Sequence, residues 1–243
     1  MRAVRRAIGW LTAIVAATAG LFLVWAMMGG RRQDLPWTPL DLGEPIGLST
    51  GRKLTALGDR FGQCRALLDR AGVRYAVLPE RHEGEHCGYG DGVRFAAGGA
   101  RRISFAPAAL GIACPVAAAL AMWEWNVVQP AAQRRFGQAV VRIDHFGSFN
   151  CRRIYGRDSG SWSEHATADA IDVAGFRLAD GTRITVARDW RGAGPRSRFL
   201  RDVRDGACTL FATTLSPDYN AAHHDHLHLD QAKRRALGWR ACR

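Results

Sequence analysis

Four of the eight histidines lie within six residues near the C-terminal end of the sequence, in the segment 220–230. His226 and His228 alternate there with two leucines, as in a strand that buries one face. Such a strand presents both imidazoles on its other face, where they could bind one metal ion. Zinc sites have at least three protein ligands, so this segment needs a partner elsewhere in the chain.

The segment 163–172 offers that partner. It contains His165 and, seven residues later, Asp172, which lies in a strand-like run at 170–175. Imidazole and carboxylate groups are both ordinary zinc ligands. The two segments together therefore offer His, Asp and His to one ion.

The pattern Ser-x-His, then Asp, then His-x-x-His-x-His resembles that of a group of zinc peptidases. This group includes D-Ala-D-Ala carboxypeptidases, penicillin-insensitive murein endopeptidases and the hedgehog signalling domain. Over residues 64–230 the sequence is also similar to the bacterial extensin-like C-terminal family. The segments that carry this similarity are 147–152, 163–166, 170–176, 206–211 and 220–230.

The resemblance implies that one zinc ion is the cofactor and that its ligands are His165, Asp172 and His228. Two neutral imidazoles and a carboxylate, with a fourth position left open, are typical of a catalytic zinc site. A capping or core role is the alternative for each residue taken alone. The simultaneous match of three positions favours the metal site.

Three more residues of the histidine-rich segment are candidate catalytic groups by the same resemblance. Asp225 stands three residues before His228, where many of the carboxypeptidases have a glutamate that acts as general base. His223 and His226 correspond to histidines of the murein endopeptidases that flank the metal and stabilise the oxyanion. The base is therefore either Asp225 or His226.

Arg152 and Ser163 are the candidate substrate-binding residues. Arg152 resembles the arginine of the Gly-Tyr-Arg-Ser turn of the zinc peptidases, and a guanidinium can bind a peptide carboxylate through two hydrogen bonds. Ser163 is expected to position His165 through a local hydrogen bond. Either Glu164 or Asp230 could orient a ligand imidazole from behind.

The composition is that of a globular protein: 243 residues, 47% hydrophobic and 23% charged, enough for one domain with a substantial core. The formal net charge of +12 would favour anionic partners, although arginines spread over solvated faces give the same total. The sequence has no run of Lys and Arg interleaved with aromatic residues, so nucleic acid is not an expected partner.

The N-terminus predicts a membrane helix. Residues 7–30 are uncharged and flanked by arginines, and these 24 residues would form a helix of about 36 Å, enough to cross a hydrocarbon core of about 30 Å. A cleavable signal peptide is the alternative, because residues 17–19 have the small-x-small form of a cleavage site. The apolar run continues past the usual signal length. We therefore expect an uncleaved, single-pass signal anchor in the bacterial inner membrane, with residues 1–6 as a cytoplasmic tip.

The six cysteines are even in number, widely spaced and free of C-x-x-C pairs. This pattern predicts three disulfides in an oxidising compartment, which places the domain in the periplasm. Six buried thiols in a cytosolic protein are the alternative. Proximity in the sequence suggests Cys64 with Cys87 as one pair.

Beyond the anchor, residues 31–51 are expected to form a semi-extended linker, and residues 52–243 a single domain. An Asp-Gly pair indicates a hairpin turn at 179–182, and Gly206 indicates the end of the last helix. Trp123 and Trp125 are expected in the core. The predicted helices are 52–71, 115–129, 130–136 and 197–205, the predicted strands are 73–78, 101–106, 138–146, 170–178 and 183–186, and 79–100 is a loop or hairpin.

This mixture predicts the α+β class: a single domain with a small antiparallel sheet flanked by helices, preceded by one transmembrane helix. The resemblance predicts a membrane-anchored periplasmic zinc peptidase whose partners are peptidoglycan peptides, cleaved as a carboxypeptidase or an endopeptidase. The alternative is a non-catalytic wall-binding or scaffolding module with a structural metal. The presence of Asp225 and His226 beside three ligands favours the enzyme, because structural zinc sites usually close the fourth position. The sequence does not predict an oligomeric state.

Overall fold

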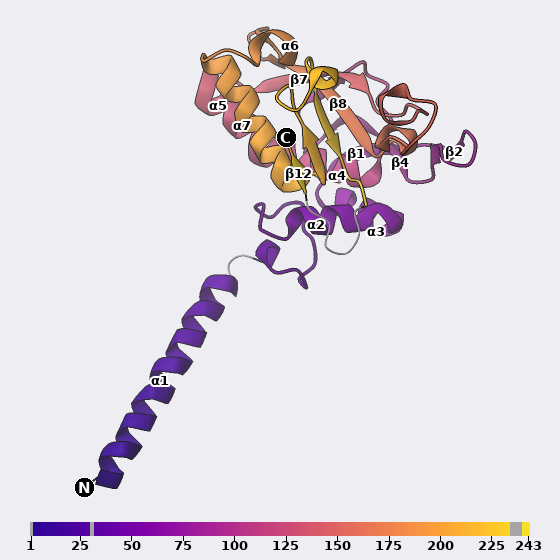
Figure 1. Cartoon of the computed structure of the whole chain (residues 1–243). Helices are drawn as coiled ribbons and strands as arrows, with labels where there is room; N and C mark the ends of the chain where they lie inside the picture. Colours follow the sequence, from indigo (N-terminus) through magenta and orange to yellow (C-terminus); the bar gives the residue numbers. More distant parts are fainter. Residues whose placement is uncertain (1, 30–31, 234–239) are drawn as a thin grey trace.

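The computed structural model describes residues 2–29, 32–233 and 240–243 (Figure 1). A long N-terminal helix, α1 (Arg2–Gly29), projects away from a domain of mixed helices and strands. Within those ranges it is the one helix long and apolar enough to cross a membrane, over Ala3–Trp25, and none of that apolar window is buried. A membrane anchor and a signal sequence both contain such a helix.

A seven-stranded sheet forms the centre of the domain. Its strand order is β12-β10-β11-β8-β7-β5, and β9 pairs with β8. Neighbouring strands are antiparallel, except that β5 and β7 are parallel, as are β10 and β12. The bounds are β5 (Ser104–Ala106), β7 (Val140–Gly147), β8 (Ala170–Leu178), β9 (Arg183–Thr185), β10 (Thr213–Leu215), β11 (Leu227–Asp230) and β12 (Ala241–Cys242).

Two smaller antiparallel sheets lie beside it, one of order β1-β4-β6 and one formed by β2 and β3. Their bounds are β1 (Val73–Val77), β2 (Arg81–His82), β3 (Gly88–Tyr89), β4 (Gly92–Gly99) and β6 (Ile112–Ala113). The structure therefore confirms the predicted α+β class with small antiparallel sheets. The two parallel pairs in the large sheet were not predicted.

Helices pack on the core side of the large sheet. The α-helices after α1 are α2 (Thr50–Thr55), α3 (Phe61–Arg70), α4 (Cys114–Trp123), α5 (Gln129–Phe136), α6 (Val186–Asp189) and α7 (Pro195–Leu210). The 3₁₀ turns are η1 (Arg32–Asp34), η2 (Ala56–Asp59), η4 (Ile154–Gly156), η5 (Glu164–Thr167) and η6 (Ala221–His223), and a π-helical turn, η3 (Glu124–Val128), joins α4 to α5.

Aromatic rings connect these helices to the sheet. The ring of Phe176 on β8 lies 5.9 Å from that of Trp123 on α4 and 5.1 Å from that of Phe199 on α7. All three side chains are buried, and Trp125 packs partly buried against the same core. The core position predicted for Trp123 is therefore correct, and these rings pack α4 and α7 against β8.

The predicted helix 52–71 is wrong as a single element. It is divided into α2, η2 and α3, and Arg60 leaves the helical region with φ −133°. Gly58 and Asp59, both weak helix formers, lie at the break.

The last predicted helix ends later than expected, at Leu210, and Gly206 lies in its interior. A Cβ at this position would lie 2.3 Å from Val127 Cγ1, so glycine is required by the close approach of α7 to η3. Gly206 was therefore misread as a helix end, because it is needed for close packing inside the helix.

The segment predicted as a linker packs against the domain in its described part, 32–51. Leu40 and Leu42 are buried in the core. The amide of Ser49 donates to Gln33 O at 3.0 Å, which closes the segment into a loop. Few residues therefore separate the domain from α1.

Two other predicted elements differ from the structure. The loop or hairpin expected at 79–100 contains the β2–β3 hairpin but also the eight-residue strand β4, whose Gly-rich end hid it. The strand expected at 101–106 begins only at Ser104, because Arg101 turns inward to a buried ion pair with Glu124 (Nε–Oε2 3.0 Å).

Three disulfides are present, as predicted, and they use all six cysteines. The suggested pair of Cys64 with Cys87 is wrong. Cys64, a buried residue of α3, pairs instead with Cys114 at the start of α4, and Cys87 pairs with Cys151. The pairs are Cys64–Cys114, Cys87–Cys151 and Cys208–Cys242.

Candidate metal centre

Strand pairing brings Asp172 and His228 together. The two residues are direct partners across the antiparallel pair β8 and β11. Their neighbours Ile171 and Leu229, also direct partners, are fully buried in the core. Since side chains alternate along a strand, Asp172 and His228 share the opposite face, close enough to interact.

His165 reaches the same place from η5. The backbone amide of His165 donates to Ser163 Oγ at 3.3 Å, so the local hydrogen bond expected of Ser163 is present at the start of this turn. Ala168, in the left-handed region with φ 57°, ends the turn. The imidazole of His165 is thereby buried against β8, with 3% of the residue exposed.

We call His165, Asp172 and His228 the ligand trio. His165 Nε2 lies 3.2 Å from His228 Nδ1 and 3.2 Å from Asp172 Oδ2, and His228 Nδ1 lies 3.0 Å from Asp172 Oδ1. Ligand atoms about 2.0–2.1 Å from a tetrahedral zinc ion lie about 3.3–3.4 Å from one another. The trio therefore has nearly the size of one face of a zinc tetrahedron, and in the described ranges no other group of His, Cys, Asp and Glu side chains has this spacing.

In both histidines of the trio, the ring nitrogen that faces away from the centre, here called the outer nitrogen, is hydrogen-bonded to the protein. His165 Nδ1 lies 2.6 Å from Ser148 O, and His228 Nε2 lies 3.1 Å from Asp230 Oδ2. A neutral imidazole has one N–H, and these acceptors take it. In that neutral form the inner nitrogens have lone pairs that face each other and the Asp172 carboxylate, so the centre favours a cation, either a proton or a metal ion. Such outer contacts are the usual support of metal-bound histidines, and the donor set fits zinc.

The electrostatics of the trio favour positive charge at its centre. Burial alone would lower the pKa of His228, but hydrogen bonds to Asp172 and Asp230 raise the pKa to about 9. Burial alone would raise the pKa of Asp172, but hydrogen bonds to His165 and His228 hold that pKa well below its usual range. The carboxylate is therefore ionised over the whole physiological pH range.

Asp225 and His226 form a pair beside the trio. His226 Nδ1 lies 2.9 Å from Asp225 Oδ1, and His226 Nε2 lies 3.5 Å from Asp172 Oδ1. Asp225 thus accepts the N–H of the imidazole and sets its tautomer, leaving Nε2 on the side of the trio.

His223 lies on the other side of His226, with ring centroids 5.1 Å apart. Its Nδ1 lies 2.8 Å from Asn220 Oδ1, which also accepts from the Ala222 amide, so Nδ1 carries the proton. Burial, with the nearby histidines, lowers the pKa of His223 to about 4. The imidazole is therefore neutral, and its free nitrogen is an acceptor that cannot donate to an oxyanion.

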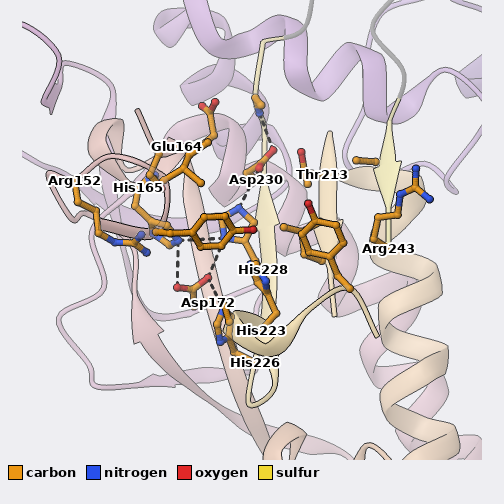
Figure 2. Close-up of a pocket in the computed structure, with 18 of the residues that line it drawn as sticks. Arg152, Glu164, His165, Asp172, Thr213, His223, His226, His228, Asp230 and Arg243 are labelled. Atoms are coloured by element: carbon orange, nitrogen blue, oxygen red, sulfur yellow. Dashed lines mark hydrogen bonds and ion pairs between the residues drawn. The ribbon is translucent and has the colours of Figure 1, made fainter. Parts of the chain in front are cut away.

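The trio opens into a cavity of about 600 Å³. Figure 2 shows Arg152 on one side of the trio and Arg243 on the other, with Asp230 and Thr213 near the His228 strand. Tyr155 also lines the cavity, and Asn220 Nδ2 donates to its hydroxyl at 2.8 Å. This volume is within the usual range of ligand-binding clefts.

The predicted site residues converge on this cavity. Every one of them lines it except Asp225, which lies behind His226. Their predicted roles in metal binding and catalysis stay predictions. Of the two candidates for orienting a ligand imidazole, Asp230 contacts His228, and Glu164 lines the cavity. The residues that line it are His165, Asp172, His228, His223, His226, Arg152 and Ser163.

Sequence reasoning missed Ser148, Asn220 and Arg243. Ser148 acts through its backbone carbonyl, which any residue could supply, so no sequence signal marks it. Asn220 opens the histidine-rich segment and could have been read as the cap of a short turn. Arg243 lies far from every motif, but it directly follows a cysteine, as Arg152 does.

A family model described as the extensin-like protein C-terminus matches residues 62–243, well over half of the chain. No curated protein and no solved structure matches the sequence.

Proposed function

The chain belongs to the extensin-like C-terminal family, and for this member we propose a zinc-dependent peptidase that acts on peptidoglycan peptides. The observation that carries the proposal is the ligand trio. Its three inner atoms are 3.0–3.2 Å apart, both imidazoles are fixed from behind, and the open side faces a cavity of about 600 Å³.

The open side of the trio favours catalysis. A structural zinc site closes four positions with protein ligands, whereas a catalytic site uses three and leaves one for water or substrate. In the part of the chain that the structure describes, the candidate group contains three side chains. A zinc ion held there would polarise a peptide carbonyl and lower the pKa of a water molecule.

We assign proton transfer to His226, with Asp225 behind it. Asp225 accepts the Nδ1–H of His226, so Nε2 is the nitrogen that can take a proton from the attacking water. The Asp225 carboxylate would then stabilise the imidazolium that forms. Both candidate bases thus have a role, one accepting the proton and the other orienting its partner.

Two further side chains fit substrate and water. Arg152 lines the cavity and forms no ion pair among the described residues, so its guanidinium can bind a carboxylate of the peptide. Neutral His223 presents an acceptor nitrogen, which suits a water or a substrate N–H better than the oxyanion role suggested by resemblance.

The location and substrate class rest on other features. α1 suits an anchor in the bacterial inner membrane, and three disulfides are typical of a domain outside the cytoplasm. Peptidoglycan is the polymer of that compartment whose sugar chains are crosslinked by short peptides. The same His, Asp and His pattern resembles that of the carboxypeptidases and endopeptidases that cleave it.

The test is digestion of purified peptidoglycan by the full chain in detergent, followed by mass spectrometry of the released fragments. We expect new fragments that disappear with a chelator, return with zinc, and are absent for His226→Ala. His82→Ala is the matched control, because His82 is exposed on β2 and does not line the cavity.

An unchanged digest across several crosslink types would reject the peptidase. If the same protein binds peptidoglycan tightly with zinc present, the wall-binding or scaffolding module becomes the better account.

A further inference from the structure

Two arginines lie at opposite sides of the ligand trio in one cavity. Figure 2 shows Arg152 and Arg243 with the trio between them. Among the residues that the structure describes, neither guanidinium forms an ion pair, although the chain contains other arginines that do. An arginine that faces a cavity without a carboxylate partner is available to an anionic ligand.

Arg243 is fixed by its backbone. Its amide donates to Thr214 O at 2.9 Å, and its main-chain oxygen accepts from the amide and the hydroxyl of Ser216 at 2.9 and 2.8 Å. The preceding residue, Cys242, is bonded to Cys208 on α7. The position of Arg243 is therefore tied both to β10 and to a helix of the core.

The register of β12 places Arg243 on the same face of the sheet as the trio. Ala241 is the partner of Thr213, and Thr213 is in turn the partner of Asp230 on β11. Ala241 and Arg243 share a face because alternate residues do, and both line the cavity. The pairing of β12 with β10, and of β10 with β11, thus places Arg243 two strands away from His228 in the same sheet.

Arg152 is held in a comparable way on the other side. The preceding residue, Cys151, is bonded to Cys87, and Arg152 O accepts from the Ser163 amide at 3.1 Å. Each cavity arginine therefore directly follows a disulfide cysteine, and each is attached by backbone hydrogen bonds. Two arginines whose backbones are fixed independently offer two anion-binding positions in the cavity.

We propose that Arg243 is a specificity-determining residue, which binds a carboxylate of the peptide on the side of the trio opposite to Arg152. This inference rests on the proposed function, which makes the bound peptide a substrate. It specifies the substrate class as a peptide with a carboxylate on each side of the scissile bond. The cavity of about 600 Å³ has room for such a segment.

The test measures binding and cleavage of soluble peptidoglycan fragments, before and after their carboxylates are converted to amides with carbodiimide and ammonia. The full chain in detergent is compared with Arg243→Gln, Arg243→Lys and Arg70→Gln. Arg70 is the matched control, since it is exposed on α3, has the same charge and does not line the cavity. Melting temperatures show whether each variant is folded.

For Arg243→Gln we expect the Kd for the acidic fragments to rise about tenfold or more, with KM rising in parallel and kcat nearly unchanged. Arg243→Lys should recover part of the affinity. For amidated fragments the wild type and Arg243→Gln should bind equally, and Arg70→Gln should match the wild type throughout.

The inference is overturned if Arg243→Gln binds the acidic fragments as tightly as the wild type, or if its loss of affinity is the same for amidated fragments. Binding that depends on Arg243 without any cleavage would support the anionic subsite while rejecting the peptidase. If Arg243→Gln cleaves the acidic fragments with the same KM and kcat as the wild type, the peptidase proposal stands and the Arg243 subsite is rejected.

Discussion

The ligand trio and the two cavity arginines are positioned by different means. Asp172 and His228 face each other across two paired strands, and His165 is locked against them by its own turn. Arg152 and Arg243 lie on a loop and at the edge of the sheet, each beside a disulfide. Backbone pairing thus sets the geometry of the candidate metal centre, whereas disulfides fix the backbone positions of the two proposed substrate-binding arginines.

This difference has a functional meaning. Metal ligands must keep atoms within a few tenths of an ångström of their ideal places, and a buried sheet face provides that precision. Substrate-binding side chains must be accessible to the substrate. A disulfide beside such a residue limits the motion of its backbone without burying its side chain. We therefore expect changes at the two regions to separate cleanly into effects on metal binding and effects on substrate.

The Asp225–His226 pair lies between the two regions and gives the largest expected effect. Asp225→Asn should reduce the rate of peptide cleavage by about 10²- to 10⁴-fold, because the amide no longer holds His226 in the tautomer that accepts a proton. Asp225 does not contact the trio directly, so zinc content should stay that of the wild type.

Cleavage rate and zinc content are measured on the same preparations, with His82→Ala as the control for handling. Loss of zinc from Asp225→Asn would show that this carboxylate contributes to metal binding. It would contradict the expectation that effects on the metal and on the substrate can be separated.

Asp230→Asn should have a smaller effect, confined to the metal centre. Asp230 is buried, with 4% exposed, and holds His228 Nε2 at 3.1 Å. Loss of this support should weaken zinc affinity about 10- to 100-fold, as is typical for such partners. With zinc in excess, the KM for peptides should change little.

Zinc affinity is determined by competition with a chromophoric chelator. Asp205→Asn provides the matched control, since Asp205 is exposed on α7, forms an ion pair with Arg204 and does not line the cavity. An unchanged affinity for Asp230→Asn would show that β11 alone fixes the imidazole.

Much of the site could be predicted from the sequence because its residues lie in two short segments. Alternation around Leu227 and Leu229 gave the correct face for His228, and the apolar run at 170–178 gave the strand that carries Asp172. The predicted α+β class followed from the same periodicities.

What could not be predicted depends on contacts distant in the chain. Leu40 and Leu42 lie in a proline-rich segment that resembles a linker until its burial is known. Cys64 pairs with Cys114 because α3 packs on α4, which no local pattern reveals. Arg243 enters the cavity only through the pairing of β12 with β10.

The direct test of the account is the zinc content of the purified full chain, measured by elemental analysis after reconstitution and removal of excess metal. We expect close to one zinc per chain for the wild type and for His82→Ala, and close to none for His165→Ala or Asp172→Ala. The wild type should also melt at a higher temperature with zinc than with a chelator, because binding to the folded state stabilises it by about 2.7 kcal/mol at 100 times Kd. A wild type that retains no zinc, or a His165→Ala variant that retains one per chain, would contradict the assignment of the ligand trio.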